Sequence, residues 1–597
     1  MYYKAPSNTP YWRRYSLQFL MGLLSVSIMP FNHASASTLE ALEFGLSANT
    51  AGKSTDRLVK LGDGTVNIAQ IPGDEPTPEP QPLPPDEEPV VPVPQPTEPV
   101  PDGSTEIEVR AIQVTGSTVF APETLQAVVA PFENRVLTLT ELQQASAAVT
   151  ELYLQEGYIT SRAIVPDQTA DDGIVQILVI EGSITDIQVE GTGRLERYVR
   201  DRVALGTGTP LNQFELEDQL RLLQFDPLFD EVDANLGAGE ALGESVLTVN
   251  VDEAEPFRIS LVADNYSPDS LGRERVGANL SYLNPLGLGD EFFTSAYVAP
   301  SGGSYVYELG YRVPLNAKNG TLQFRFVPSE FNIVDSEAAN IPEELDIRGS
   351  ADLYNLSFRQ PLIRTPREEL ALSLGFRHRI GETFISDFLV DDSAVSVIQF
   401  GQDYLRRDTR GAWAFQSQFN IGTGFFDATI SDSSADSRFL SWRGQAQRVQ
   451  LLGPNNTLIL QADLQLSDDP LLGSEQFILG GGQSVRGYQQ NVRAADNGFR
   501  FSVEDRIVLI RDAEADDNPL LQIAPFVDLG VVWNNSDNDA DIDDNFLLGT
   551  GLGVIVTPIP ELDLRVDLGF PLIDLDDPGD PESVGQIYFQ VVFSPTR

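Results

Sequence analysis

Apolar and polar side chains alternate in segment after segment over residues 256–597. In the segment "ELDLRVDLGF", Leu564, Val566 and Leu568 fall on one face of an extended backbone, and charged side chains fall on the other. Since side chains alternate across a β-strand, this period of two predicts strands with one apolar face. At roughly 21 residues for each strand and its connection, the region is expected to form a transmembrane β-barrel of about sixteen antiparallel strands.

The outer face of such a barrel would contact membrane lipid, and its lumen would hold water. Tyr311 and Trp533 lie near predicted strand ends, as is typical of aromatic girdles at the membrane surfaces. No segment after residue 36 has the eighteen or so consecutive apolar residues of a membrane helix. A soluble β-sandwich would also have strands with one apolar and one polar face, but it seldom contains so long a region of this alternation.

The N-terminal region predicts export and a spacer. Basic residues precede an apolar run and then "ASAS", where Ala34 and Ala36 fit the small-residue rule for leader cleavage, so residues 1–36 are expected to be a signal peptide. Residues 37–71 form an extension. Residues 72–104 are rich in proline and acidic residues, which favours extended polyproline II conformations and predicts a linker. At about 3.1 Å per residue it could reach on the order of 90 Å.

Composition excludes several kinds of site. There is no cysteine, and the net charge of −49 disfavours nucleic acid as a partner. One of the two histidines leaves with the signal peptide, so only His378 could act as an imidazole base or ligand, and its neighbours are arginines, which favours a surface or lumen position. The acidic run 537–544 lacks the glycine and the final glutamate of a calcium loop. We therefore expect no metal, no cofactor and no enzymatic activity.

Residues 105–255 contain an internal repeat, which predicts two α+β domains at 105–182 and 183–255. Gly116 and Gly191 follow the first strand of each copy, and each copy then shows two helical segments and two strands. In the first copy the helix over 141–155 is expected to begin at a Thr140 cap. On this pattern alone, a generic α+β pair without a partner stays possible.

A second motif concerns one arginine in a glycine-rich loop. The stretch "GGGQSVRGYQQN" places Val485, Arg486, Gly487 and Tyr488 after three glycines, which permit a sharply bent backbone. We predict that this loop folds into the barrel as a lid. An isolated "RG" pair would more often be an exposed surface turn.

The expected partner of Arg486 is a carboxylate on the barrel wall. In "FVDLG", alternation turns Phe526, Asp528 and Gly530 inward, and an inward carboxylate needs a partner or water. A guanidinium can grip a carboxylate with two hydrogen bonds. At 4 Å and an effective dielectric near 20, the attraction is about 4 kcal/mol. Exchanging the two charges is then expected to restore part of what each single change removes.

These motifs carry a family resemblance. "VRGY" at 485–488 with "FVDLG" at 526–530 resembles the signature of outer-membrane insertases and translocators, and the repeat resembles tandem POTRA domains. With "VADNYSPDSLGRERVGANLSYLNPLGLGD" at 262–290, the chain is similar to the haemolysin secretion/activation family of two-partner secretion translocators. The resemblance implies a Gram-negative outer membrane, periplasmic POTRA domains, insertion by the barrel assembly machinery, and a secreted exoprotein as an unfolded client. In that family an N-terminal helix can plug the pore, and residues 38–50 are the candidate.

Client capture is expected at the first POTRA domain, by strand addition or in a groove between helix and strand. The candidate contacts are the helix over 141–155 and the four residues Ile159, Arg162, Ile164 and Val165. Two alternatives stay open: an insertase that assembles other barrels, which would more often carry three or more POTRA units, and a passive barrel that serves as a surface receptor or adhesin.

Overall fold

A computed structural model of the chain describes residues 79–83, 106–169, 171–336, 346–431, 435–512, 518–535, 545–575 and 585–595. The chain divides into two compact units, one comprising residues 86–254 and the other residues 1–85 together with 255–597. The predicted signal peptide, the candidate plug at 38–50 and the acidic run at 537–544 lie outside the described residues.

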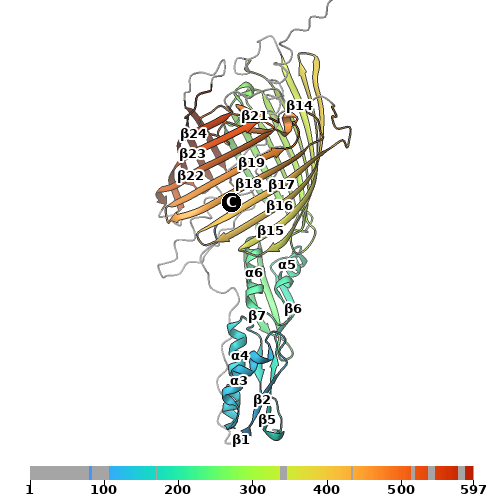
Figure 1. The fold of residues 1–597 in the computed structure, drawn as a ribbon, viewed down its shortest axis with the longest axis vertical. Helices are drawn as coiled ribbons and strands as arrows, with labels where there is room; N and C mark the ends of the chain where they lie inside the picture. The colour runs from blue at the N-terminus through green and yellow to red at the C-terminus, as the bar shows by residue number, and fades with distance from the viewer. Residues whose placement is uncertain are drawn as a thin grey trace, which may run out of the picture. The chain divides into compact units, whose positions relative to one another are not determined.

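The second unit is a closed barrel of sixteen antiparallel strands, which confirms the predicted fold (Figure 1). The barrel closes where β26 pairs with β9, for example at Val591 opposite Ala263. The strands are β9 (Phe257–Asp264), β10 (Arg275–Leu283), β11 (Glu291–Val298), β12 (Ser304–Pro314), β13 (Thr321–Asn332), β14 (Ile347–Arg364), β15 (Glu368–Ile385), β16 (Phe388–Asp408), β17 (Gly411–Thr423), β18 (Leu440–Gly453), β19 (Asn456–Ser467), β22 (Asn497–Asp512), β23 (Asn518–Trp533), β24 (Phe546–Ile559), β25 (Leu562–Pro571) and β26 (Gln586–Phe593).

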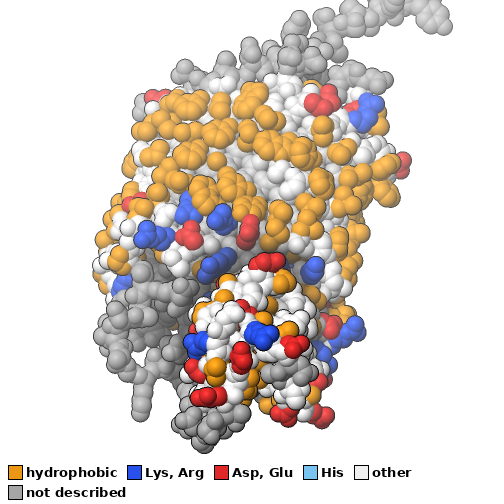
Figure 2. All heavy atoms as spheres, turned by 60° about the horizontal axis from the view of Figure 1, so that its bottom comes forward, with side chains coloured by type: hydrophobic (Ala, Val, Ile, Leu, Met, Phe, Trp, Pro, Cys, Tyr) orange, Lys and Arg blue, Asp and Glu red, His pale blue; other side chains and the backbone are white. Residues whose placement is uncertain are grey.

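The two faces of the wall differ as the alternation predicts. Along β25, Val566 and Leu568 are exposed on the outside, whereas Asp567 is buried on the inside. Figure 2 shows hydrophobic side chains spread over the outer surface of the barrel. The interior instead holds buried ion pairs between neighbouring strands, such as Arg325 with Glu308 at 2.6 Å. Because the unpaired polar edges of a sheet disappear on closure, a barrel can place this apolar surface in lipid.

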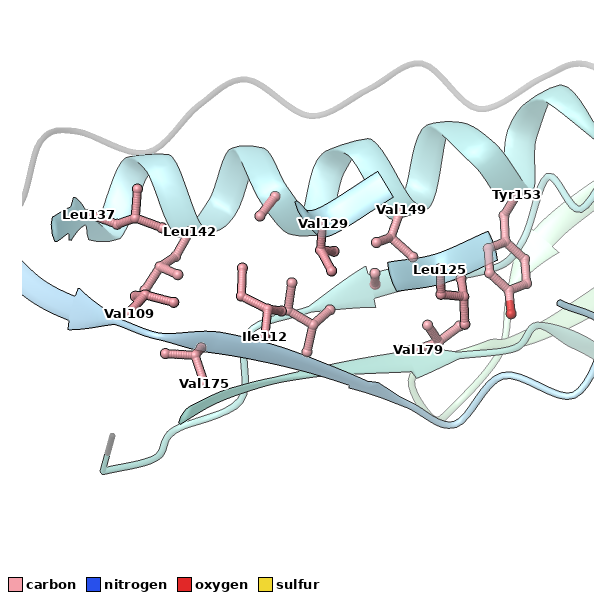
Figure 3. Packing of buried hydrophobic residues seen from close by; sticks show 13 residues of the cluster. Val109, Ile112, Leu125, Val129, Leu137, Leu142, Val149, Tyr153, Val175 and Val179 are labelled. Carbon is pink, nitrogen blue, oxygen red and sulfur yellow. The ribbon is translucent and has the colours of Figure 1, made fainter. Parts of the chain in front are cut away.

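The first domain of the other unit packs helices on a small sheet. Strands β2 (Ala111–Thr115), β5 (Ile174–Ile180) and β4 (Arg162–Ile164) form the sheet in that order, and β1 (Glu106–Val109) pairs with β3 (Arg135–Thr138). Helices α3 (Pro122–Val129) and α4 (Leu139–Gln155) cover it. Figure 3 shows their apolar side chains meeting those of β2 and β5, and Leu142, Val149 and Val175 are almost fully buried there. This domain therefore has a conventional apolar core.

The second domain repeats the plan with β6 (Ser183–Glu190), α5 (Glu196–Val203), α6 (Gln213–Gln224), β7 (Phe229–Ala238) and β8 (Glu244–Glu253). Its sheet order is β6-β8-β7. Gly116 and Gly191 have φ of 86° and 87°, and an added Cβ would lie 2.3 Å and 2.0 Å from a carbonyl oxygen of the facing strand. Glycine is needed at both places because a side chain has neither the conformation nor the room.

The predicted cap of α4 is wrong by two residues. Thr138, not Thr140, is the N-cap: its hydroxyl accepts from the Glu141 N–H, and the Glu141 carboxylate accepts from the Thr138 N–H at 2.8 Å. This reciprocal pair uses two N–H groups that a helix start leaves without intrahelical partners, which favours Thr138. None of the described helices has the length and apolar character required to cross a membrane.

Candidate functional site

The loop between β19 and β22 carries the predicted lid motif. It contains a short hairpin, β20 (Phe477–Leu479) with β21 (Arg493–Ala495), and a cluster of buried apolar side chains. In this cluster Val485 and Tyr488 of the loop pack with Val532 of β23 and Leu547 of β24. The loop is therefore a folded element bound to the wall rather than an exposed turn.

Arg486 contacts Asp528 of β23 through two parallel hydrogen bonds. Its Nε lies 2.7 Å from Asp528 Oδ2 and its Nη2 lies 2.9 Å from Oδ1, while the backbone N–H of Arg486 also donates to Oδ2 at 3.1 Å. Phe526, which also points inward, lies under the guanidinium, with 3.4 Å from the Arg486 Cζ to the ring centroid. Both charged side chains are nearly inaccessible to solvent, so the pair combines a fork, a ring contact and a low local dielectric.

Two further carboxylates approach the same guanidinium. Arg486 Nη1 donates to Glu504 Oε2 of β22 at 2.7 Å and lies 4.0 Å from Asp567 Oδ1 of β25. Arg565 of β25 donates to Glu504 and to Asp567, at 2.7 Å and 2.8 Å. Arg506 of β22 donates to the second oxygen of Glu504 at 2.7 Å. The site is thus an alternating network of three arginines and three carboxylates, and charge alternation is what makes burial of so many ions tolerable.

Glycines on the wall let the loop backbone lie directly against the strands. A Cβ at Gly549 of β24 would lie 1.9 Å from the Arg486 carbonyl oxygen, and one at Gly569 of β25 would lie 2.6 Å from the Gly487 nitrogen. Gly487 itself has φ of 109° and would place a Cβ 2.7 Å from the Phe570 carbonyl carbon. Gly549 and Gly569 therefore leave room on the wall for the loop backbone, and we call the part of the wall around them the loop seat.

Two tyrosines hold the loop on either side of this seat. The Tyr588 hydroxyl of β26 accepts from the Gly487 N–H at 3.0 Å and donates to the Tyr488 carbonyl. The Tyr488 hydroxyl accepts from the Leu548 N–H at 3.1 Å and donates to the Ile573 carbonyl at 2.9 Å. Backbone groups of the loop and of the wall are thereby satisfied although they are away from water.

The loop has a second attachment to another part of the wall. Glu475 Oε2 accepts from Arg377 Nη2 of β15 at 2.5 Å, and both side chains are almost fully buried. Gln465 of β19 donates to the Glu475 carbonyl at 3.0 Å. Since β15 lies four strands from β19 in the barrel order, the loop is bonded to widely separated strands of the wall.

Part of the proline-rich segment also belongs to the barrel unit. Residues 80–82 are buried, and the Leu83 N–H donates to the Asp408 carbonyl at the end of β16, at 2.9 Å. Glu79 Oε2 accepts from Arg506 Nη1 at 3.4 Å. The expectation of a plain spacer over 72–104 is therefore wrong for residues 79–83, because Glu79 finds a buried cation on the wall. Through Arg506 and Glu504 this segment is connected to Arg486.

The candidate client contacts lie around the edge strand β4, but not all can meet a client. Arg162 is exposed and Ile164 and Val165 are half-buried, whereas Ile159 is 7% exposed and precedes the strand. The strand itself comprises only Arg162–Ile164, because the turn after α4 takes the residues before it. Ile159 is thus placed for packing in the domain.

Near this edge, Glu181 directly follows β5 and accepts hydrogen bonds from Thr118, which follows β2, and from Tyr153 of α4. Burial raises the pKa of Glu181, but hydrogen bonds from the Thr118 hydroxyl and N–H and from Tyr153 outweigh it, so that the pKa lies below its usual value. The Thr118 N–H donates at 2.6 Å and the Tyr153 hydroxyl at 2.9 Å.

Sequence reasoning missed Glu504, Arg506, Arg565 and Asp567 as members of the site. A signal was present: in "VEDR" and "LRVD", charged residues two apart project from the same inward face. His378, expected on the surface or in the lumen, projects from the outer face of β15, and its Nδ1 lies 2.8 Å from Ser396 Oγ. Within the described residues, no group of His, Asp or Glu side chains is arranged to hold a metal ion.

Residues 243–556, more than half of the chain, match the family of haemolysin secretion/activation proteins ShlB/FhaC/HecB. The chain belongs to this family. Residues 107–182 match the ShlB-type POTRA domain. The chain is thus an outer-membrane translocator of two-partner secretion, with its POTRA domains in the periplasm.

Among relatives, the outer membrane transporter CdiB of Escherichia coli is 27% identical over 403 residues, covering 65% of this chain and 67% of the relative. CdiB of Dickeya dadantii is 25% identical over 477 residues, covering 78% and 82%. The solved structure of CdiB from Escherichia coli superposes with a TM-score of 0.66 at 24% identity, covering 84% of this chain and 92% of the other, and shows the same fold.

Proposed function

We propose that this translocator binds one unfolded secreted polypeptide at its POTRA domains and passes it through the barrel when the loop carrying Arg486 leaves its seat. The client adds to the β4 edge of the first POTRA domain, with Arg162, Ile164 and Val165 as contacts, because main-chain hydrogen bonds capture an extended chain with little regard to its sequence. Domain boundaries at 182/183 and 255/256 separate capture from passage.

The observation that carries the proposal is that charged side chains, rather than apolar ones alone, hold the loop against the wall. A loop that served only as a permanent plug would be held well enough by apolar packing. Here the contact surface contains six ionised groups, and their mutual attraction weakens once water reaches them, since the Coulomb energy falls as the dielectric rises. An arriving polypeptide that hydrates the lumen therefore loosens the loop without unfolding the wall.

Residues 79–83 add a second obstacle to passage. They occupy space inside the barrel unit and end at Asp408, beside the short connection between β16 and β17. An extended client and this segment compete for the same lumen, so we propose that the segment leaves when the client enters.

The experiment measures secretion of the cognate exoprotein by cells that carry Arg486→Gln, Asp528→Asn or both changes. Each single change leaves a buried charge without its partner and is expected to abolish most secretion, since such losses amount to about 3–5 kcal/mol. The double change removes one charge of each sign, keeps the remaining Glu504, Asp567, Arg565 and Arg506 balanced, and is expected to secrete more than either single variant.

The structure makes double neutralisation a better test than charge exchange. An aspartate at position 486 would face Glu504 and Asp567, so an exchanged pair would fail even if the loop acts as proposed. Arg348→Gln, which breaks an exposed pair with Asp346, is the matched control and should secrete normally. Equal secretion by all variants would contradict the lid. Loss of unrelated outer-membrane barrels on depletion of the chain would instead indicate an insertase.

A further inference from the structure

The connection after β17 folds back over the outside of the barrel. Ser396 Oγ of β16 donates to the Phe425 carbonyl at 2.8 Å. The Thr429 N–H donates to the Ala394 carbonyl at 2.8 Å, and the Ala394 N–H donates to Thr429 Oγ1 at 2.9 Å. These bonds attach residues 424–430, which we call the outer loop, to the edge of β16 beyond the end of β17.

The outer loop crosses β16 and reaches the strand beyond it. The Phe426 ring lies 5.5 Å from the Phe376 ring and 5.7 Å from the His378 ring, measured between centroids, and both residues are on β15. On that strand Arg377 is turned inward, where it meets Glu475. Because neighbouring residues point to opposite faces, Phe376 and His378 project outward, and Phe426 therefore covers them from outside.

Although Phe426 rests on Phe376 of the wall, the outer loop leaves large apolar side chains exposed. Phe425 is 56% exposed, Phe426 is 69% exposed and Ile430 is 52% exposed. Phe426 and Asp427 both have φ of 55°, a left-handed conformation in which glycine or asparagine is far easier to accommodate than phenylalanine. The turn thus does not call for an aromatic residue; what the phenylalanine contributes is its ring.

Charged side chains on the outward face of β15 and β16 mark how far the outer loop lies from the β15–β16 hairpin. Glu382 and Asp392 are paired in register, exposed and on the same outward face as His378. They lie toward the β15–β16 hairpin, and Phe426 lies on the other side of this pair, over the apolar residues. Asp427 is exposed beside it. An aromatic pair next to one carboxylate fits the boundary between head groups and acyl chains, where amphipathic groups gather.

We propose that the outer loop is a lipid anchor, with Phe425, Phe426 and Ile430 inserted among the outermost acyl segments of the surrounding leaflet. The occupant is lipid because the loop continues the lipid-facing surface of the barrel without a break: Phe426 rests on Phe376, and the outward residues in register with Phe376, Leu356 and Ile398, extend that surface on both sides. Phe425 and Phe426 both keep more than half of their surface exposed, and burial of such phenylalanine surface in acyl chains is favourable.

The anchor can be tested with single cysteines because the chain has none of its own. Full-length Phe426→Cys is labelled with an environment-sensitive fluorophore and reconstituted into phospholipid vesicles that contain lipids with a nitroxide high on the acyl chain. Phe388→Cys is the matched control: Phe388 is 78% exposed at the neighbouring hairpin, beyond the Glu382 and Asp392 charges.

The expected result is that acyl nitroxide quenches the label at 426 severalfold more than the label at 388, and that aqueous iodide shows the opposite order. Iodide quenching at 426 equal to that at 388 would overturn the proposal. Quenching at 426 that appears only at high protein density, without nitroxide, would assign the surface to a second copy and overturn it as well. If Phe426→Cys fails to give the heat-modifiable folded barrel, Ile430→Cys carries the same expectation.

Discussion

The first POTRA domain and the barrel interior differ in the kind of side chain that they bury. The core of the domain is apolar: Leu142, Val149 and Val175 pack between helix and sheet (Figure 3). The interior of the barrel, at the loop seat, holds Arg486 and Asp528 at similarly low exposure. The first kind of core is stabilised by removal of apolar surface from water, whereas the second depends on mutual satisfaction of charges. Truncation of one buried side chain should therefore lower the stability of the apolar core, whereas in the barrel interior it should leave a buried charge without its partner.

The largest effect on stability is expected in the apolar core. Leu142→Ala removes a side chain that is 1% exposed and should destabilise the first POTRA domain by about 2–5 kcal/mol, because a cavity adds to the lost transfer free energy. Hydrogen exchange of the β2 and β5 amides in the full chain measures this. Leu139→Ala, in the same helix but 42% exposed, should change exchange little; equal effects would mean that the domain has no close-packed core.

A change of one methyl group at the loop seat should alter gating more than stability. In Gly549→Ala the new Cβ would overlap the Arg486 carbonyl oxygen, so the loop must move while the β24 ladder stays intact. We expect more frequent open states in single-channel recordings. Gly453→Ala meets nothing within 4 Å and serves as control. Indistinguishable recordings from the two variants would argue against a close seat.

A smaller effect is expected where the proline-rich segment meets the network. Glu79→Gln weakens one charge-assisted bond to Arg506, worth about 1.5–3 kcal/mol when fully formed, and the separation of 3.4 Å places it at the weak end. Open probability should rise modestly, and less than in Gly549→Ala. Asp387→Asn, at an exposed hairpin tip, should leave the recordings unchanged. A reduction in open probability would contradict the role of this segment as an obstacle.

The smallest effect concerns pH and the Glu181 junction. Since the pKa of Glu181 is lower in the folded chain than in the unfolded chain, its stabilising contribution is present above the unfolded pKa and is lost as the pH falls through the folded pKa. Protection of the Thr118 amide from hydrogen exchange should therefore fall in this acidic range. Glu181→Gln should remove that pH dependence; an unchanged profile in the variant would assign it to another group.

The architecture can be predicted from the alternation of side chains, because periodicity is a local property. Alternation over 256–597 was sufficient to predict the barrel and its sixteen strands, and the paired Gly116 and Gly191 marked the repeat, since each needs a conformation that only glycine adopts easily. Local signals were weaker at boundaries: Thr138 and Thr140 are both plausible caps by residue type, and only the reciprocal bond to Glu141 distinguishes them.

Which distant groups meet depends on how the closed barrel brings its strands and loops together. The alternation predicted that Asp528 points inward, but the positions of Glu504 and Asp567 beside Arg486 depend on strand stagger and on the path of a loop, and neither leaves a periodic trace in the sequence. The same holds for Glu79 on Arg506 and for Phe426 on the outer wall. A polyproline-like segment and a polar loop carry no long-range pairing pattern, so their docking follows from shape and charge that exist only once the barrel has closed.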